Sequence, residues 1–356
     1  MTRVAVVASR KFNPGHCSHL IATHKLLHEV GLHVFLLLHP SFKSMDMGQG
    51  TSIVTNMRDL RRLGRVDLLV VTFPSVQALF DIVLMKCLYR TSVAYVFHEP
   101  FESVRSYLNA GFGARKTARI CLISIVNWGI VLLSDKVILP SQKAAGLFRT
   151  KYSRPHRRHA MIPLLFDDEA KGEDLGKERC YIAYIGTIAE DHAFDEFLKF
   201  VELAIGNHLF TNHRYLLATG SSLSSSVRVS VAPLVASGRM EVLEGRPLSN
   251  AEINDCFARS VVVWNAYKRS MQSGVLPKAY MFGTPLLVSS STRSEFFTDR
   301  RNGVLISDKY DFGEIKDAIA NIIENFGEYS LACRRQFLEV FYYRAQSQAF
   351  ARFILE

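Results

Sequence analysis

Short apolar runs alternate with helical stretches along nearly the whole chain, and this alternation constrains the fold more than any other feature of the sequence. The runs are rich in Val, Ile and Leu, as at residues 4–8 and 33–38. Buried strands of parallel sheets have this composition, and a helix that joins two parallel strands forms a right-handed β-α-β unit. The sequence therefore predicts an α/β fold built on parallel sheets.

The same pattern gives positions for most strands and several helices. In the first half we expect strands at residues 4–8, 33–38, 68–72, 93–98 and 136–139, and a helix from about Cys17 to Val30 that Gly31 closes. In the second half we expect strands at 180–186, 215–218, 240–244, 261–264, 286–289 and 302–306, and helices near 194–204, 250–258 and 312–326.

The length of the chain favours two domains, because 356 residues exceed what one hydrophobic core usually serves. Residues 167–179 are charged, contain two glycines and show no apolar periodicity, as in a linker. We therefore expect an N-terminal domain at 1–165 and a C-terminal domain at 180–331. Residues 332–356, rich in Arg and Phe, are expected to form one long amphipathic helix that packs back on the body.

The stretch 272–288 couples a helix start to a strand. Ser273 and Gly274 can open a helix whose first N–H groups lack intrahelical partners, and such a start attracts a diphosphate. Pro277 falls in the first turn, and Gly283 suits the left-handed residue that ends a helix. The stretch predicts a site for a phosphorylated ligand; the alternative is an ordinary helix-to-strand connection.

A second candidate site lies at the end of the first predicted strand. The loop that contains Gly15 and His16 precedes the first helix, at the carboxyl end of that strand, where open α/β sheets bind ligands. The alternative is a tight turn that only starts the helix.

The charge is unevenly distributed. The net charge is +10, but residues 1–163 hold 22 Lys and Arg against 8 Asp and Glu, which leaves the remainder net negative. Two arginine clusters could bind nucleic acid, anionic lipid or a pyrophosphate-bearing acceptor, or could form a solvated surface. The first contains Arg58, Arg61, Arg62 and Arg65, and the second contains Arg154, Arg157 and Arg158. No aromatic stacking motifs are interleaved with them, so we do not expect nucleic-acid binding.

The cysteines indicate a reducing compartment and no structural metal. All six are widely separated, with no C-x-x-C pair and no nearby histidine cluster at zinc spacing. The apolar run after Arg3 is too short for a signal peptide. We therefore expect a cytoplasmic protein.

One apolar stretch raises the question of whether the chain contacts a membrane. Residues 120–134 carry no charge but are shorter than the about 20 residues that a spanning helix needs, so we do not expect a span. With Arg115, Lys116 and Arg119 before it, the stretch could lie on a membrane surface. The alternative is a buried helix of the N-terminal domain.

The second half resembles the nucleotide-sugar-binding domain of the group 1, or family 4-like, glycosyltransferases. The resemblance rests on short segments in the same order: 184–187, 215–220, 242–249, 264–267, the Gln-Ser-Gly of 272–274, Glu295, and 302–303. The first half resembles the acceptor domain of these enzymes more loosely, through 96–100 and 137–141. Together the segments span nearly the whole chain.

The resemblance implies the GT-B fold, in which two Rossmann-like doubly wound parallel-sheet domains face a cleft. It also implies a glycosyltransferase that moves a sugar from a nucleotide-sugar donor to a saccharide or lipid-linked acceptor. The expected setting is bacterial polysaccharide biosynthesis, with peripheral attachment at the inner face of the cell membrane. The nucleotide-sugar is a substrate, so no cofactor is expected, and without a D-x-D signature no metal is expected.

Particular residues take roles from this resemblance. The expected donor-binding residues are Gly186, Thr187, Tyr267, Lys268, Ser273, Gly274, Val275 and Glu295. His98 could orient the sugar or take a proton, and Glu99 could act as base if the enzyme inverts configuration. The alternatives are a structural histidine at 98 and a surface carboxylate at 295.

The sequence also departs from the family. Lys278 or Ala279 stands near the place of the second of two glutamates, which binds the ribose in many members. The family's phosphate-binding Arg and Lys after the first strand are missing, and Lys268 or Arg269 could replace their charge. These departures keep two alternatives open: a catalytically silent GT-B subunit that binds a partner or an anionic polymer, and a UDP-sugar epimerase.

Overall fold

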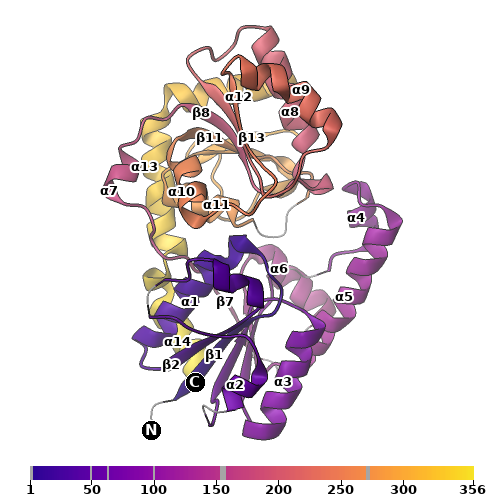
Figure 1. Ribbon diagram of the computed structural model, residues 1–356, viewed down its shortest axis with the longest axis vertical. Helices are drawn as coiled ribbons and strands as arrows, with labels where there is room; N and C mark the ends of the chain where they lie inside the picture. The colour runs from indigo at the N-terminus through magenta and orange to yellow at the C-terminus, as the bar shows by residue number, and fades with distance from the viewer. Residues whose placement is uncertain (1–2, 49, 62–63, 99–100, 153–157, 270–272) are drawn as a thin grey trace. The chain divides into compact units, whose positions relative to one another are not determined.

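The protein was analysed as a computed structural model that describes residues 3–48, 50–61, 64–98, 101–152, 158–269 and 273–356. The chain divides into two compact units (Figure 1). Unit 1 comprises residues 1–167 and 340–356, and unit 2 comprises residues 168–339.

Unit 1 is built on a seven-stranded sheet in the order β3-β2-β1-β4-β5-β6-β7. Every neighbouring pair is parallel. The strands are β1 (Val4–Ser9), β2 (His33–Leu38), β3 (Ser52–Val54), β4 (Leu68–Val71), β5 (Ser92–Val96), β6 (Lys136–Leu139) and β7 (Arg158–Met161).

Helices connect these strands, and serine caps start three of them. The helices are η1 (Pro14–His16), α1 (Cys17–Glu29), η2 (Pro40–Ser44), α2 (Met57–Arg61), α3 (Val76–Tyr89), α4 (Val104–Asn109), α5 (Ala114–Leu133), α6 (Gln142–Leu147), a π-helical turn at Phe148–Tyr152, and α14 (Tyr343–Leu355). The side chains of Ser75, Ser103 and Ser141 accept a backbone N–H at the starts of α3, α4 and α6.

The core of unit 1 lies between its sheet and the helices that cover it. On one face Val6 and Tyr95 of the sheet pack with Ile82 of α3 and Ile130 of α5. In Figure 1, α3 and α5 run side by side along this flank of the sheet. Successive strand residues point to opposite faces, and nearly every position of the inner strands β1, β2, β4, β5 and β6 is buried, because helices cover both faces of the sheet there; the edge strands β3 and β7 are half-buried or exposed.

Unit 2 is built on a six-stranded parallel sheet in the order β10-β9-β8-β11-β12-β13. Its strands are β8 (Tyr181–Ile185), β9 (Arg214–Ala218), β10 (Met240–Leu243), β11 (Ser260–Asn265), β12 (Leu286–Ser289) and β13 (Gly303–Ile306). Its helices are α7 (Gly172–Leu175), η4 (Glu190–His192), α8 (Phe194–Gly206), α9 (Ser225–Ala236), α10 (Asn250–Ala258), α11 (Val275–Met281), η5 (Ser290–Thr292), α12 (Phe312–Glu324) and α13 (Phe326–Gln336).

The end of the chain corrects one expectation. The predicted single helix over 332–356 is wrong, because α13 is followed by a π-helical turn at Phe337–Phe341, an extended Tyr342 and then α14. The backbone of Phe166 holds this break: its N–H donates to the carbonyl of Phe341 (2.8 Å), and its carbonyl accepts from the N–H of Tyr343 (2.9 Å). The Tyr343 hydroxyl then donates to Glu29 of α1 (2.7 Å). The last helix therefore belongs to unit 1.

Candidate functional site

Each sheet has a point at which the order of its strands reverses, and both predicted sites lie at such points. In unit 1 the first and fourth strands of the chain, β1 and β4, are neighbours, and in unit 2 β8 and β11 take the same places. Open parallel sheets bind ligands outside the carboxyl ends of such a strand pair. Gly15 and His16 follow β1, whereas Gly186 follows β8 and Tyr267 follows β11.

Three segments meet around Gly186 in unit 2. Gly186 has φ 141°, a backbone conformation that favours glycine. A Cβ at this position would lie 3.8 Å from the hydroxyl oxygen of Tyr267 and 3.8 Å from Cγ2 of Val275. The predicted donor residues of β8, β11 and α11 are therefore brought together at the strand ends.

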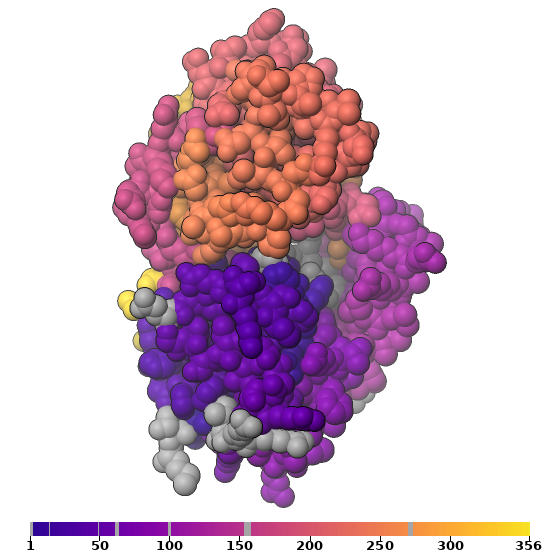
Figure 2. Space-filling view, viewed as in Figure 1, coloured from indigo at the N-terminus to yellow at the C-terminus, as the bar shows by residue number. Residues whose placement is uncertain are grey.

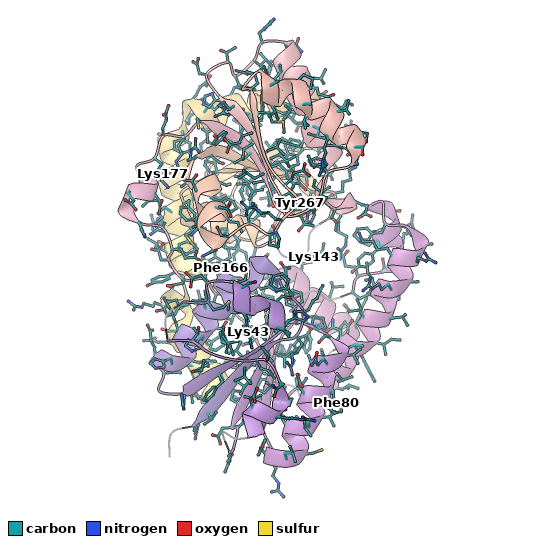
Figure 3. The ribbon with its side chains drawn as sticks, in the orientation of Figure 1. Lys43, Phe80, Lys143, Phe166, Lys177 and Tyr267 are labelled. Atoms are coloured by element: carbon teal, nitrogen blue, oxygen red, sulfur yellow. The ribbon has the colours of Figure 1, made fainter. Side chains whose placement is uncertain are left out.

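Tyr267 is the buried centre of this group (Figure 3). Burial raises the pKa of Tyr267, and its hydroxyl is hydrogen-bonded to the side chain of Ser273. Its carbonyl accepts the hydroxyl of Ser289 from the end of β12 (2.5 Å). The imidazole of His192 stacks on the tyrosine ring, with centroids 4.3 Å apart and planes 14° apart.

His192 is a residue of this site that the sequence did not reveal. The carbonyl of Thr187 accepts both the Tyr184 hydroxyl (2.9 Å) and Nδ1 of His192 (2.6 Å). Because a carbonyl only accepts, Nδ1 carries the hydrogen in this bond, and Nε2 lies 3.9 Å from Oδ1 of Asp191. The ring is thus fixed by a hydrogen bond on one atom and by the stacked Tyr267. Residues 190–192 occupy the region where the family resemblance predicts a lysine, and nothing in their local sequence indicates a role for His192.

The helix start predicted at Ser273 and Gly274 is present. Gly274 precedes α11 and is exposed, and a Cβ at this position would meet no heavy atom of the described residues within 4 Å. The N–H of Val275 donates to Oγ of Ser273 (3.2 Å). Gly283 has φ 65° and ends the helix ahead of β12, as predicted. Gln272 lies outside the described residues.

The two candidate cations approach carboxylates. The N–H groups of Lys268 and Arg269 both donate to the carbonyl of Asp191 (2.8 and 3.3 Å). Nζ of Lys268 lies 3.7 Å from Oε1 of Glu196, and Nη1 of Arg269 lies 3.7 Å from Oδ2 of Asp191. Both separations are longer than those of a hydrogen-bonded ion pair.

Lys278 has a different environment from the other cations. Its ammonium lies 2.7 Å from Oε2 of Glu169 and 2.7 Å from Oδ1 of Asn254, and the side chain is buried. Lys278 therefore anchors the segment after residue 167 to α10 and α11. Glu295 lies in an exposed turn between β12 and β13.

In unit 1 the rings of His16, Phe73 and His98 form a cluster. The imidazole of His16 stacks on Phe73 with centroids 3.8 Å apart, and the His98 ring lies 5.5 Å from His16 and 4.9 Å from Phe73. These residues follow β1, β4 and β5, so the predicted His16 and His98 come together. The N–H of Gly15 donates to Oδ1 of Asn13 (3.0 Å) in the turn before His16. Glu99 lies outside the described residues.

Burial keeps two histidines of this unit uncharged at neutral pH. Burial, and then the nearby His98 and His19, hold the pKa of His16 well below its ordinary value. The pKa of His19 is lowered to about 4, chiefly by burial. Nε2 of His16 accepts from the side-chain amide of Asn13 (3.1 Å), so Nδ1 carries the hydrogen, and within the described residues it has no hydrogen-bond partner. His19, which the sequence did not single out, lies against Leu165 instead (Nδ1 to O, 3.0 Å).

Three further observations concern metal ligands, the membrane and the arginine clusters. In the described parts of the chain, no group of three or more His, Cys, Asp or Glu side chains could hold a metal ion. Among the helices of the described residues, α5 is long and apolar enough to cross a membrane by length and composition, with a mean hydropathy of 1.5. Of the two arginine clusters, the structure shows Arg58, Arg65 and Arg158 as exposed, whereas Arg62, Arg154 and Arg157 lie outside the described residues.

No protein-family model and no curated protein sequence matches this chain. Among solved structures, it is similar to the sucrose-phosphate synthase of Thermosynechococcus elongatus, with a TM-score of 0.72, 13% identity and 98% of each chain covered. It is also similar to Anabaena HepE in complex with UDP and glucose (TM-score 0.69, 14% identity, 98% of each chain covered). A third similar structure is WaaG, a glycosyltransferase involved in lipopolysaccharide biosynthesis (TM-score 0.67, 11% identity, 99% of each chain covered). The chain thus has the GT-B fold of glycosyltransferases, with two doubly wound parallel-sheet domains, as the sequence predicted.

Proposed function

We propose that this protein is a glycosyltransferase of the hexosyltransferase type, which moves a sugar from a nucleotide-sugar donor to a saccharide or lipid-linked acceptor. The observation that carries the proposal is the meeting of Gly186, Tyr267 and Val275 where the strand order of unit 2 reverses. Next to this group, a Cβ at Gly274 would meet no heavy atom of the described residues within 4 Å. Bound UDP and UDP-glucose in HepE structures of the same fold support a nucleotide-sugar as the donor.

The departing nucleoside diphosphate needs positive charge or N–H donors to stabilise it. In this proposal the start of α11 contributes N–H groups, and Lys268 and Arg269 turn from their carboxylate partners toward the phosphates. The stacked Tyr267 and His192 form a rigid wall beside the diphosphate. Glu295 is proposed to contact sugar hydroxyls.

Unit 1 is proposed to bind the acceptor. His16 and His98 lie together after β1 and β5, and the uncharged imidazole of His16 has an Nδ1–H donor for a hydroxyl group. His98 is proposed to orient the sugar or to take the proton that the acceptor hydroxyl loses. The proposed setting is polysaccharide assembly at the inner face of an anionic membrane, to which the basic unit 1 is attracted.

Calorimetric titration with UDP, GDP, dTDP and CMP tests the donor site. We expect one nucleotide to bind selectively, and Gly274→Asp to abolish binding because a carboxylate would occupy the space beside the helix start. Gly327→Asp is the matched control: it places the same side chain at an exposed position near the start of α13, where a Cβ also meets no atom within 4 Å. If no nucleotide binds to folded protein, the chain is instead a silent subunit that binds a partner or an anionic polymer.

A further inference from the structure

Helices α3, α4 and α5 of unit 1 expose large apolar side chains, and we call these side chains together the helical face. Its main members are Phe80 on α3, Val104 and Leu108 on α4, and Leu122, Ile125 and Trp128 on α5. Phe80, Leu122 and Ile125 are 64%, 65% and 67% exposed. Phe80 is labelled on α3 in Figure 3, and the purple-magenta atoms of α4 and α5 lie at the surface in Figure 2. Helix α5 packs against both α3 and α4, and exposed apolar side chains on neighbouring helices usually mark a site of interaction.

Helix α5 is the centre of the helical face and is not a buried core helix. Only 22% of its most apolar 18 residues are buried, which rules out the expectation of a buried helix for this segment. One side of it nevertheless belongs to the fold: Asn127 is buried and accepts the hydroxyl of Tyr95 from β5 (2.7 Å). Gly129 allows a close approach to Leu79 of α3. Because α5 is fixed to the sheet along one side, its apolar side can lie on a membrane but the helix does not cross one.

The charges of the helical face favour an anionic surface. Arg115, Arg119, Leu122 and Ile125 follow one another at spacings of four and three residues, which places them along one side of α5. Arg115, Lys116 and Arg119 are exposed at its start, and Arg105 is exposed on α4. Neither α4 nor α5 contains an acidic residue. The one acidic residue of α3, Asp81, is buried against Arg10 (2.6 Å).

We propose that the helical face docks on the surface of a bilayer that contains anionic lipid, with Leu122, Ile125 and Trp128 in the interfacial region and the cations of α4 and α5 against the headgroups. Amphipathic helices with this division of apolar and basic residues lie in the membrane interface, and an indole is suited to that region. A second copy of the chain fits less well, because two such faces would bring like charges together. This inference concerns unit 1 and needs no nucleotide, so it and the proposed donor site can fail independently.

Co-sedimentation with vesicles tests this docking. The full-length protein is mixed with vesicles of phosphatidylcholine alone or with an equal amount of phosphatidylglycerol, at low and high salt. We expect binding to the anionic vesicles that weakens as salt rises. Changing Arg115, Lys116 and Arg119 together to Gln is expected to weaken binding about a hundredfold, at roughly fivefold for each cation.

The double variant Leu122→Glu, Ile125→Glu tests the apolar part and is expected to weaken binding at least about tenfold. Its matched control is Val229→Glu, Leu331→Glu, which changes two residues of unit 2 that are 74% and 75% exposed. Circular dichroism confirms that each variant is folded. The proposal is overturned if anionic vesicles fail to bind the wild-type protein, or if the Leu122 and control variants bind equally well. It is also overturned if light scattering shows a dimer that the Leu122 variant dissociates, since the face would then join two copies.

Discussion

The buried His19 makes the stability of unit 1 sensitive to acid. Its Nδ1 donates to the carbonyl of Leu165, and burial lowers its pKa from 6.5 to about 4. The unfolded chain therefore binds a proton more readily than the folded unit between these two values. Stability from this group is complete above pH 6.5 and is lost as the pH falls toward 4.

The size of the effect follows from the two pKa values. A difference of about 2.5 in pKa corresponds to about 3 kcal/mol, of which about 2 kcal/mol is lost between pH 7 and pH 5. His19→Gln keeps a donor for Leu165 but cannot be protonated. We expect the loss of unfolding free energy between pH 7 and pH 5 to be smaller in this variant by about 2 kcal/mol. His16 contributes in the same direction, so some acid sensitivity remains.

Urea unfolding followed by fluorescence measures this difference. In a Trp264→Phe background the emission comes from Trp128 of unit 1, because the chain has two tryptophans. The matched control, His33→Gln, changes an exposed histidine of the same unit. If the free energy of unfolding depends on pH equally in His19→Gln and in the wild type, His19 is not the source of the acid sensitivity. The same conclusion follows if His33→Gln reduces the pH dependence as much as His19→Gln does.

Three further predictions concern unit 2. Lys278→Ala removes the ammonium that lies 2.7 Å from Oε2 of the partly buried Glu169, and is expected to lower the free energy of unfolding by about 3 kcal/mol, measured by urea unfolding; no change would show that the network is not stabilising. Gly303→Ala is expected to lower the free energy of unfolding by about 3 kcal/mol or more, because φ is 156° and a Cβ would lie 2.2 Å from the carbonyl oxygen of Leu286. A melting temperature equal to that of the wild type would contradict this. Lys268→Ala and Arg269→Ala are each expected to lower the rate of sugar transfer on the order of a hundredfold without unfolding the protein. Full activity in both variants would show that these residues are not the cations that bind the diphosphate.

Features set by local chemistry could be predicted from the sequence. The helix at 250–258 has the predicted bounds because Ser249 and Glu252 form a capping box at its start. Gly283 takes the predicted left-handed conformation because it ends a helix ahead of a strand. The predicted strands 33–38, 136–139 and 286–289 also have the observed bounds, since each is a compact apolar run.

Features set by contacts between distant residues could not be predicted. The break near Tyr342 depends on the backbone of Phe166, so the apolar periodicity of 332–356 alone indicated a continuous helix. The positions of His19 and His192 beside the sites depend on Leu165 and Tyr267, which neither local sequence contains. The exposure of α5 could not be predicted either, because an apolar helix in the core and one on the surface can have the same composition.

Hydrogen–deuterium exchange, measured with and without the nucleotide that binds, tests whether the donor site lies after β8 and β11. We expect slower exchange on binding in three segments of unit 2, at residues 184–192, 264–269 and 273–281, and little change in β10 or α9. Protection confined to other segments, or nucleotide binding without protection of these three, would contradict it.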